Sequence, residues 1–332
     1  MKTKLCKALG IDTPIILAPM AGAVTPRLAA AVSNAGGLGN LPLWIADRQT
    51  IETTVREMRG LTSKPFAVNL NMDFPQEERL SICLDEGVPV ISFFWQDPSP
   101  LIQKAKDGGA IVMHTVGDAE TAKRSVESGV DIVVAQGWEA GGHVRGTVAT
   151  MPLIPAVVAA VGETPVVAAG GIADGRGMAA ALALGASGVW IGTRFLASEE
   201  IAIHPDYQQR VLAQAETDTV YLENLFDVGW PNAPHRVLRN STVAAWEDAG
   251  RPTSGNRPGE GEVIASSPSR GNVVRYASAT PSEDMTGAIG ALPMWAGQSS
   301  GLVQTVEPAA TIMEQIKNEA VAVIHNLTPL AR

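Results

Sequence analysis

The sequence predicts an α/β fold: a (β/α)8 (TIM) barrel with a second, smaller and mostly helical domain covering the C-terminal face of the barrel. Short apolar, β-branched runs alternate with Ala-rich helical stretches, which is typical of parallel strands joined by helices. Eight such runs occur, and eight strands close a barrel. The chain has 332 residues. A typical barrel of this kind needs ~250 residues, so about 80 remain for a further domain.

The eight predicted strands are apolar on both faces, as expected where helices cover the outside of a barrel and side chains fill its interior. They are residues 15–20, 37–41, 66–71, 88–94, 110–116, 131–136, 165–170 and 188–195. A doubly wound open sheet is the alternative. The number of strands and the lack of an early Gly-rich turn for a dinucleotide favour the barrel.

Helices are predicted between these strands from their start and stop signals. The Thr25-Pro26 pair is a typical helix start and Gly36 a typical end, so residues 27–34 are expected to be helical. Comparable patterns predict helices at residues 47–59, 77–86, 99–106, 118–128 and 175–184.

The character of the chain changes after the predicted barrel, residues 1–197. Residues 198–226 look helical and polar, and Pro-, Gly- and Ser-rich loops follow them, so residues 198–290 are predicted to form a small helical and irregular domain. The last segment, residues 291–332, has apolar residues at i, i+3 and i+4 spacing over 309–324. We expect this stretch to form a helix that packs back on the barrel.

Net charge, the lack of certain motifs and the lack of long apolar stretches exclude several classes of function. The 25 Lys and Arg against 34 Asp and Glu give a net charge of −9, and no basic run occurs, so nucleic acid is not an expected partner. The absence of metal-ligand spacings and of a nucleophile elbow argues against a metal site and against a serine or cysteine nucleophile. No stretch is apolar enough to span a bilayer and none resembles a secretion signal, so we expect a cytoplasmic protein without a membrane partner.

Candidate binding residues lie at the C-terminal ends of the strands, which surround the active site in barrels of this type. The first strand ends in Ala18-Pro19-Met20, where small residues let the backbone approach a flat ligand. The third ends in Asn69, whose amide suits the edge of a heterocycle, and the sixth ends in Gln136. These positions predict a site for a planar cofactor.

The ends of the last two strands indicate a phosphate site. Gly171 follows the seventh strand and Gly192-Thr193 the eighth, where backbone N–H groups commonly bind phosphate in these barrels. The glycine pair taken alone also fits a simple turn. No P-loop lysine pattern is present, which argues against hydrolysis of a nucleoside triphosphate.

His143 is the candidate catalytic residue, because it lies in a Gly-rich loop just past the sixth strand. An imidazole near neutrality can take a proton from an acidic carbon or donate a hydrogen bond to a developing anion. Glu139 in the same loop fits either acid/base work or the capping of backbone N–H groups, and His114 is favoured as a core histidine over a site donor. The other histidines, which fall away from strand ends, are given no role: His204, His235 and His325.

Together these segments resemble the nitronate monooxygenase family, formerly called 2-nitropropane dioxygenases. The resemblance rests on PIILAPMAG, GGLGNLP, FAVNLN, QGWEAGGHVRG, AAGGIADGRG with GVWIGTRF, and MWAGQSSGLV. It covers residues 11–198 and returns at about 294–315. It implies a TIM barrel that holds FMN, with phosphate at Gly171 and Gly192-Thr193. It also implies further cofactor-binding residues at Ala18, Pro19, Met20, Asn69, Gln136, Gly141 and Trp190.

The resemblance also implies a reaction: oxidative denitrification of alkyl nitronates with O2 to carbonyl compounds and nitrite, with His143 as base or hydrogen-bonding partner. Enzymes of the same family pattern also include NAD(P)H-dependent reductases of an enoyl thioester or quinone. This reductase activity is the alternative to nitronate oxidation. A phosphate-binding lyase or isomerase is an alternative from another class. The expected partners are a small-molecule substrate and O2, with a homodimer left open. Trp138 is expected to narrow the pocket, and residues 198–290, which match the family poorly, are expected to select the substrate.

Overall fold

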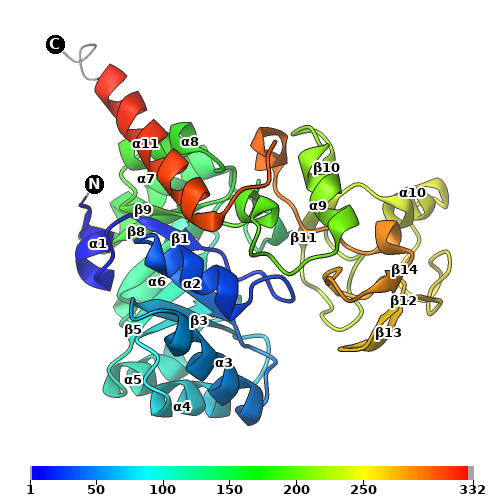
Figure 1. Ribbon diagram of the computed structural model, residues 1–332, viewed down its shortest axis with the longest axis horizontal. Coiled ribbons are helices and arrows are strands. Elements are labelled where there is room, and N and C mark those ends of the chain that lie inside the picture. Colours follow the sequence, from blue (N-terminus) through cyan, green and yellow to red (C-terminus); the bar gives the residue numbers. More distant parts are fainter. Residues whose placement is uncertain (1, 328–332) are drawn as a thin grey trace.

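The computed structural model describes residues 2–327 and shows the predicted (β/α)8 barrel (Figure 1). Eight parallel strands form one sheet in the order β1-β9-β8-β6-β5-β4-β3-β2. Their bounds are β1 (Ile15–Leu17), β2 (Gly39–Pro42), β3 (Phe66–Asn71), β4 (Val90–Phe94), β5 (Ile111–Val116), β6 (Ile132–Gln136), β8 (Val166–Ala169) and β9 (Gly188–Ile191). Leu17 N donates to Leu38 O at 2.9 Å and Leu38 N to Ile15 O at 3.0 Å, so the first and second strands close the ring.

All eight predicted strands are confirmed, although the first ends at Leu17 and the eighth at Ile191, where residues 193–197 form a 3₁₀-helix instead. Six of the surrounding helices match predicted ones. These are α2 (Pro26–Asn34), α3 (Arg48–Leu61), α4 (Glu77–Asp85), α5 (Ser99–Asp107), α6 (Ala119–Glu127) and α8 (Gly175–Ala183). Two helices were not predicted: α1 (Lys4–Leu9) and α7 (Thr150–Val161). α1 has only six residues, and α7 carries Pro155 in its interior, which is normally a helix-breaking signal.

The short helix α1 has a clear packing role. Its Leu5 and Leu9 are buried in one cluster with inward-facing strand residues such as Ile16, Val134 and Val167. A second cluster fills the space between the strands and the outer helices. The barrel interior is therefore a packed core, and α1 contributes to it.

The C-terminal helix packs back on the barrel as predicted. α11 (Ala309–Leu327) lies along α8 and α2, with Ile312, Met313 and Ile316 in the outer core. Gly175 at the start of α8 permits this contact, because a Cβ there would lie 2.3 Å from Ala320 N. The predicted segments 1–197 and 291–332 include residue 1 and residues 328–332, which lie outside the described residues.

The prediction of a mostly helical second domain is wrong. Residues 198–290 hold only two α-helices, α9 (Pro205–Leu212) and α10 (Ser241–Asp248). The same residues also form five strands: β10 (Thr219–Leu222), β11 (His235–Leu238), β12 (Val263–Ser267), β13 (Gly271–Val274) and β14 (Thr286–Gly287). The helix expected over 198–226 is confined to α9, because Pro205 sits at its first turn and the β-branched run at 219–222 pairs with β11 instead.

One strand joins the two parts of the molecule. β7 (Gly142–His143), in the loop after β6, pairs antiparallel with β11, so that His143 lies opposite His235. The small domain thereby extends a sheet into the mouth of the barrel, and Figure 1 shows it to the right of the barrel (lime to orange). Within residues 2–327, no helix is long and apolar enough to cross a membrane.

Candidate active site

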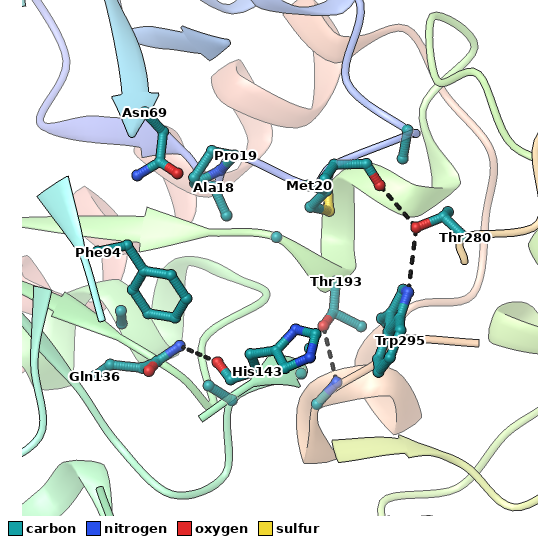
Figure 2. A pocket seen from close by; sticks show the side chains of 18 of the residues that line it. Ala18, Pro19, Met20, Asn69, Phe94, Gln136, His143, Thr193, Thr280 and Trp295 are labelled. Carbon is teal, nitrogen blue, oxygen red and sulfur yellow. Dashed lines mark hydrogen bonds between the residues drawn. The ribbon is translucent and has the colours of Figure 1, made fainter. Parts of the chain in front are cut away.

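A large cavity lies at the C-terminal ends of the barrel strands, between the barrel and the small domain. Its empty volume is about 1400 Å³, open mouth included. All the site residues expected from the sequence line it: Ala18, Pro19, Met20, Asn69, Gln136, Gly141, His143, Gly171, Trp190, Gly192 and Thr193. Figure 2 labels Ala18, Pro19, Met20, Asn69, Gln136, His143 and Thr193 among them. The fold therefore gathers residues that are up to 175 positions apart in the chain, since 193 − 18 = 175.

One end of the cavity consists of the loops after β8 and β9. The backbone N–H groups of Gly171, Gly192 and Thr193 donate no hydrogen bond to the backbone of the described residues. Gly171 has φ of 72°, a conformation that favours glycine. A Cβ at Gly192 would lie 3.2 Å from Ala18 Cβ and 3.5 Å from Met20 Sδ, so glycine lets the loop after β9 pack closely against the loop after β1. Such a cradle of free N–H groups fits a phosphate.

Two amide side chains fix the middle of the cavity. Asn69 Nδ2 donates to Ser92 O at 3.1 Å and to Ser92 Oγ at 3.2 Å. Gln136 Nε2 donates to the backbone oxygen of His143 at 3.1 Å, which ties the end of β6 to the loop that carries His143 (Figure 2). Asn69 thus uses its amide nitrogen on Ser92 and has its amide oxygen left for a ligand, whereas Gln136 has its amide oxygen and one N–H left.

His143 lies in an aromatic enclosure. Its ring centroid is 3.8 Å from that of Trp230, 5.0 Å from Trp295, 6.1 Å from Trp95 and 5.7 Å from His235. The residue as a whole is half-buried, but its Nε2 atom is excluded from solvent and has no hydrogen-bond partner in the described chain. Burial, and then the neighbouring His235, hold the pKa of His143 well below its usual value of 6.5. The imidazole is therefore uncharged at neutral pH.

Several residues of the cavity wall come from the small domain and carry no signal in the sequence. Tyr207, Trp230, Arg270, Ser278 and Thr280 line the cavity from that side. None of them follows a barrel strand, so the rule used for the barrel could not find them. Residues 198–290 thus contribute directly to the site.

Trp295 belongs to the MWAGQSS motif and joins the small-domain wall to the barrel. Thr280 Oγ1 donates to Ala21 O at 2.7 Å and accepts from Trp295 Nε1 at 3.1 Å (Figure 2). Thr193 Oγ1 accepts from Gly297 N at 3.0 Å. These bonds hold the wall against the loops after β1 and β9.

The structure decides between the open alternatives for two residues. The Glu139 carboxylate accepts from Thr150 N at 2.9 Å and from Thr150 Oγ1 at 3.1 Å, so Glu139 caps the start of α7. His114 is buried outside the cavity, and its Nδ1 lies 2.8 Å from Ser125 Oγ. Burial lowers the pKa of His114 to about 4. His114 is thus a core histidine, as favoured.

Two other expectations need correction. Trp138 does not narrow the cavity, because its ring packs under the guanidinium of Arg236 at 4.5 Å and beside Tyr221 at 5.4 Å, away from the cavity wall. His235 was given no role, but it lies directly opposite His143 in the β7–β11 pair. The sequence could not reveal this, since pairing between distant strands follows from the fold.

Comparison with known proteins agrees with the geometry. The family model described as nitronate monooxygenase matches residues 2–78 and 74–319. A nitronate monooxygenase of Paraburkholderia phytofirmans is 32% identical over 99% of this chain and 98% of its own. A (3aS,4S,5R,7aS)-5-hydroxy-7a-methyl-1-oxo-octahydro-1H-indene-4-carboxyl-CoA dehydrogenase of Rhodococcus jostii is 39% identical over 75% of this chain and 69% of its own.

Two solved structures resemble the whole chain. FabK from Thermotoga maritima superposes with a TM-score of 0.81 at 32% identity and covers 99% of both chains. A nitroalkane oxidase from Streptomyces ansochromogenes superposes with a TM-score of 0.76 at 25% identity, over 98% of this chain and 100% of its own. The match of the family model over nearly the full length, on a barrel whose strand ends converge on one cavity, shows that the chain belongs to the nitronate monooxygenase family of oxidoreductases.

Proposed function

We propose that this protein is an FMN-dependent oxidoreductase that uses O2 to convert alkyl nitronates into carbonyl compounds and nitrite. The observation that carries the proposal is the place of His143. An uncharged imidazole with an unpaired Nε2 shares one cavity with the free N–H groups of the strand-end glycines. The 32% identity to a nitronate monooxygenase over almost the full length of both chains supports it.

The residues present fit FMN. The N–H groups of Gly171, Gly192 and Thr193 would hold the phosphate. Ala18-Pro19-Met20, Asn69 and Gln136 would border the flavin ring. When bound, the flavin supplies the one-electron and oxygen chemistry that ordinary side chains lack.

His143 would act on the substrate as a base or as a hydrogen-bonding partner. Its uncharged state leaves a ring nitrogen ready to accept a proton from the carbon beside a nitro group. The same low pKa makes it a weak base, because the charged imidazolium is disfavoured in the aromatic enclosure. We therefore expect preformed nitronates, which need no proton removal, to be better substrates than neutral nitroalkanes.

The proposal predicts a yellow protein that releases nitrite. We expect the purified protein, reconstituted with FMN if necessary, to consume O2 and form nitrite from ethyl nitronate in air. Nitrite release and O2 uptake are measured together, with boiled protein and with free FMN as controls. A protein that cannot be loaded with flavin, or a flavin-loaded protein that forms no nitrite from a panel of nitronates, would refute the proposal.

A second candidate is an NAD(P)H-dependent reductase of an enoyl thioester or quinone, and Arg270 favours it. Arg270 is the only residue with a charged side chain among the described residues that line the cavity, so no lining residue forms an ion pair with it. The hairpin turn that carries it is fixed, because Asp284 accepts from Ser269 N and Oγ. An unpaired guanidinium at the cavity wall suits a phosphate of a nicotinamide nucleotide or of a thioester carrier.

Replacing Arg270 by Gln separates the two candidates. In the reductase, we expect Kd for NADH or NADPH, measured from the rate of anaerobic flavin bleaching at increasing nucleotide concentration, to rise about tenfold, since a charge-assisted hydrogen bond contributes roughly 1.5–3 kcal/mol. Arg210→Gln is the matched control, because Arg210 is an exposed arginine of the small domain that does not line the cavity. No bleaching of the wild-type flavin by either nucleotide would remove the reductase candidate.

A further inference from the structure

The ring of His143 is held in place by packing. Catalytic imidazoles are usually oriented by a hydrogen bond from one ring nitrogen to a carboxylate or carbonyl. Here the hydrogen bonds to His143 in residues 2–327 involve its backbone, through Gln136 and the strand pair with β11. The imidazole itself is bordered by Trp230, whose ring centroid lies 3.8 Å away with the two planes inclined by 32°. This is the shortest of the ring distances at His143, and it is van der Waals contact.

Trp230 is itself anchored to the barrel. Its Nε1–H donates to Asp73 Oδ2 at 2.7 Å, and the other oxygen of Asp73 accepts from Gln96 Nε2 at 2.9 Å. Asp73 N donates to Asn71 Oδ1 at 3.0 Å, which fixes the carboxylate just after β3. The bond between the indole and a carboxylate is charge-assisted and directional, so it sets the rotation of the Trp230 ring.

The rest of the Trp230 ring is enclosed by aromatic side chains of the barrel. Trp230 is only 5% exposed. Its centroid lies 5.1 Å from that of Trp95, 5.5 Å from Trp44 and 5.9 Å from Phe74. A residue of the small domain thus sits in a barrel pocket and presents one face to His143.

We propose that Trp230 is the positioning residue for His143, and that the Asp73 carboxylate fixes Trp230 for this purpose across the boundary between barrel and small domain. The proposal rests on the proposed function only in that His143 is taken to act on the substrate. It assigns to Trp230 the task that a hydrogen-bonded carboxylate performs in catalytic pairs, which is to hold the imidazole in place. Asp73, just after β3, then holds Trp230. The simpler reading is that Trp230 only closes the cavity.

Four substitutions distinguish the two readings. Trp230→Phe keeps an aromatic face but removes the N–H, and Asp73→Ala removes the acceptor. Asp73→Asn keeps an acceptor oxygen, so it should restore the anchor. Trp246→Phe is the matched control, because Trp246 is a half-buried tryptophan of the small domain whose Nε1 donates to Pro252 O at 2.9 Å, outside the cavity.

Gln96→Ala is a second control, because it removes the hydrogen bond from Gln96 to Asp73 and keeps the one from Trp230 to Asp73. Each variant is checked for flavin content and for its melting temperature before comparison. If Asp73→Ala does not fold, Trp230→Phe and Asp73→Asn still test the anchor.

We expect kcat for nitroethane, whose proton His143 would remove, to fall about tenfold in Trp230→Phe and Asp73→Ala with little change in KM, because a misplaced catalytic group costs rate more than binding. The double variant should be no slower than either single one, since both remove the same anchor. Asp73→Asn, Gln96→Ala and Trp246→Phe should stay close to wild type. Additive losses in the double variant, or a change in KM alone, would show that Trp230 only closes the cavity.

A second measurement does not depend on activity. The chain has five histidines, so selective labelling gives five imidazole signals, and His143→Asn identifies that of His143. An indole 3.8 Å away shifts this signal strongly by its ring current. We expect the His143 signal to move in Trp230→Phe and Asp73→Ala while those of His114, His204 and His325 stay in place. An unmoved His143 signal in Asp73→Ala would overturn the proposal even if nitronates are turned over, whereas a moved signal without nitrite release would refute the proposed function alone.

Discussion

Replacement of His143 by Asn is expected to leave flavin binding intact and to slow the turnover of neutral nitroalkanes far more than that of preformed nitronates. A positioned general base contributes about 10²- to 10⁴-fold, so kcat/KM for nitroethane should fall within this range. For ethyl nitronate, which has already lost its proton, we expect a loss of less than about tenfold, from the hydrogen bond alone. Parallel nitrite assays with both substrates measure the ratio.

The pH dependence checks the same assignment. As the proposed base, His143 would act in its neutral form, and its lowered pKa keeps that form dominant at neutral pH. In the wild-type protein kcat/KM for nitroethane should therefore stay level through neutral pH and fall only in acid, where His143 becomes protonated. The Asn variant should lose this acidic limb. An equal loss on both substrates, with the limb retained, would argue against proton abstraction by His143.

Gly141→Ala is expected to destabilise the protein strongly. Gly141 lines the cavity, as the resemblance implied, but the structure adds a second requirement. A Cβ at this position would lie 2.4 Å from Ala296 C and from Gly297 N, which are backbone atoms of the segment that crosses it. Because backbone cannot yield like a flexible side chain, we expect the free energy of unfolding to drop by about 3 kcal/mol, with weaker retention of flavin. Thermal or urea unfolding measures the first effect and flavin absorbance the second.

The neighbouring glycine is the control for Gly141. Gly142 has φ of 74°, so alanine there is strained, but nothing lies within 4 Å of its added Cβ. Gly142→Ala should therefore cost only about 1–2 kcal/mol, the usual penalty of a left-handed alanine. Equal costs at the two positions would mean that conformational strain, and not the crossing of the two segments, makes glycine necessary at Gly141.

The sequence by itself determined the barrel and the barrel side of the cavity. Strands buried on both faces appear as continuous apolar runs, and the rule that sites form at strand ends placed Asn69, Gln136 and Gly171 at the cavity correctly. These features are local: a strand, its last residue and the turn after it are adjacent in the chain. Features that do not depend on adjacent residues were missed. The helix α7 is an example, because its internal Pro155 hides the local helix signal and the helix acquires its stability from packing.

Only the tertiary structure decided what surrounds His143. Trp230, His235 and Trp295 reach it through strand pairing and loop crossing between segments 87 or more positions away, since 230 − 143 = 87. No local pattern encodes such contacts, because an isolated tryptophan or histidine in a loop looks the same whether it faces solvent or a site. The sequence thus supplied the catalytic candidate, and the fold supplied the aromatic enclosure that keeps its imidazole uncharged by excluding water from it.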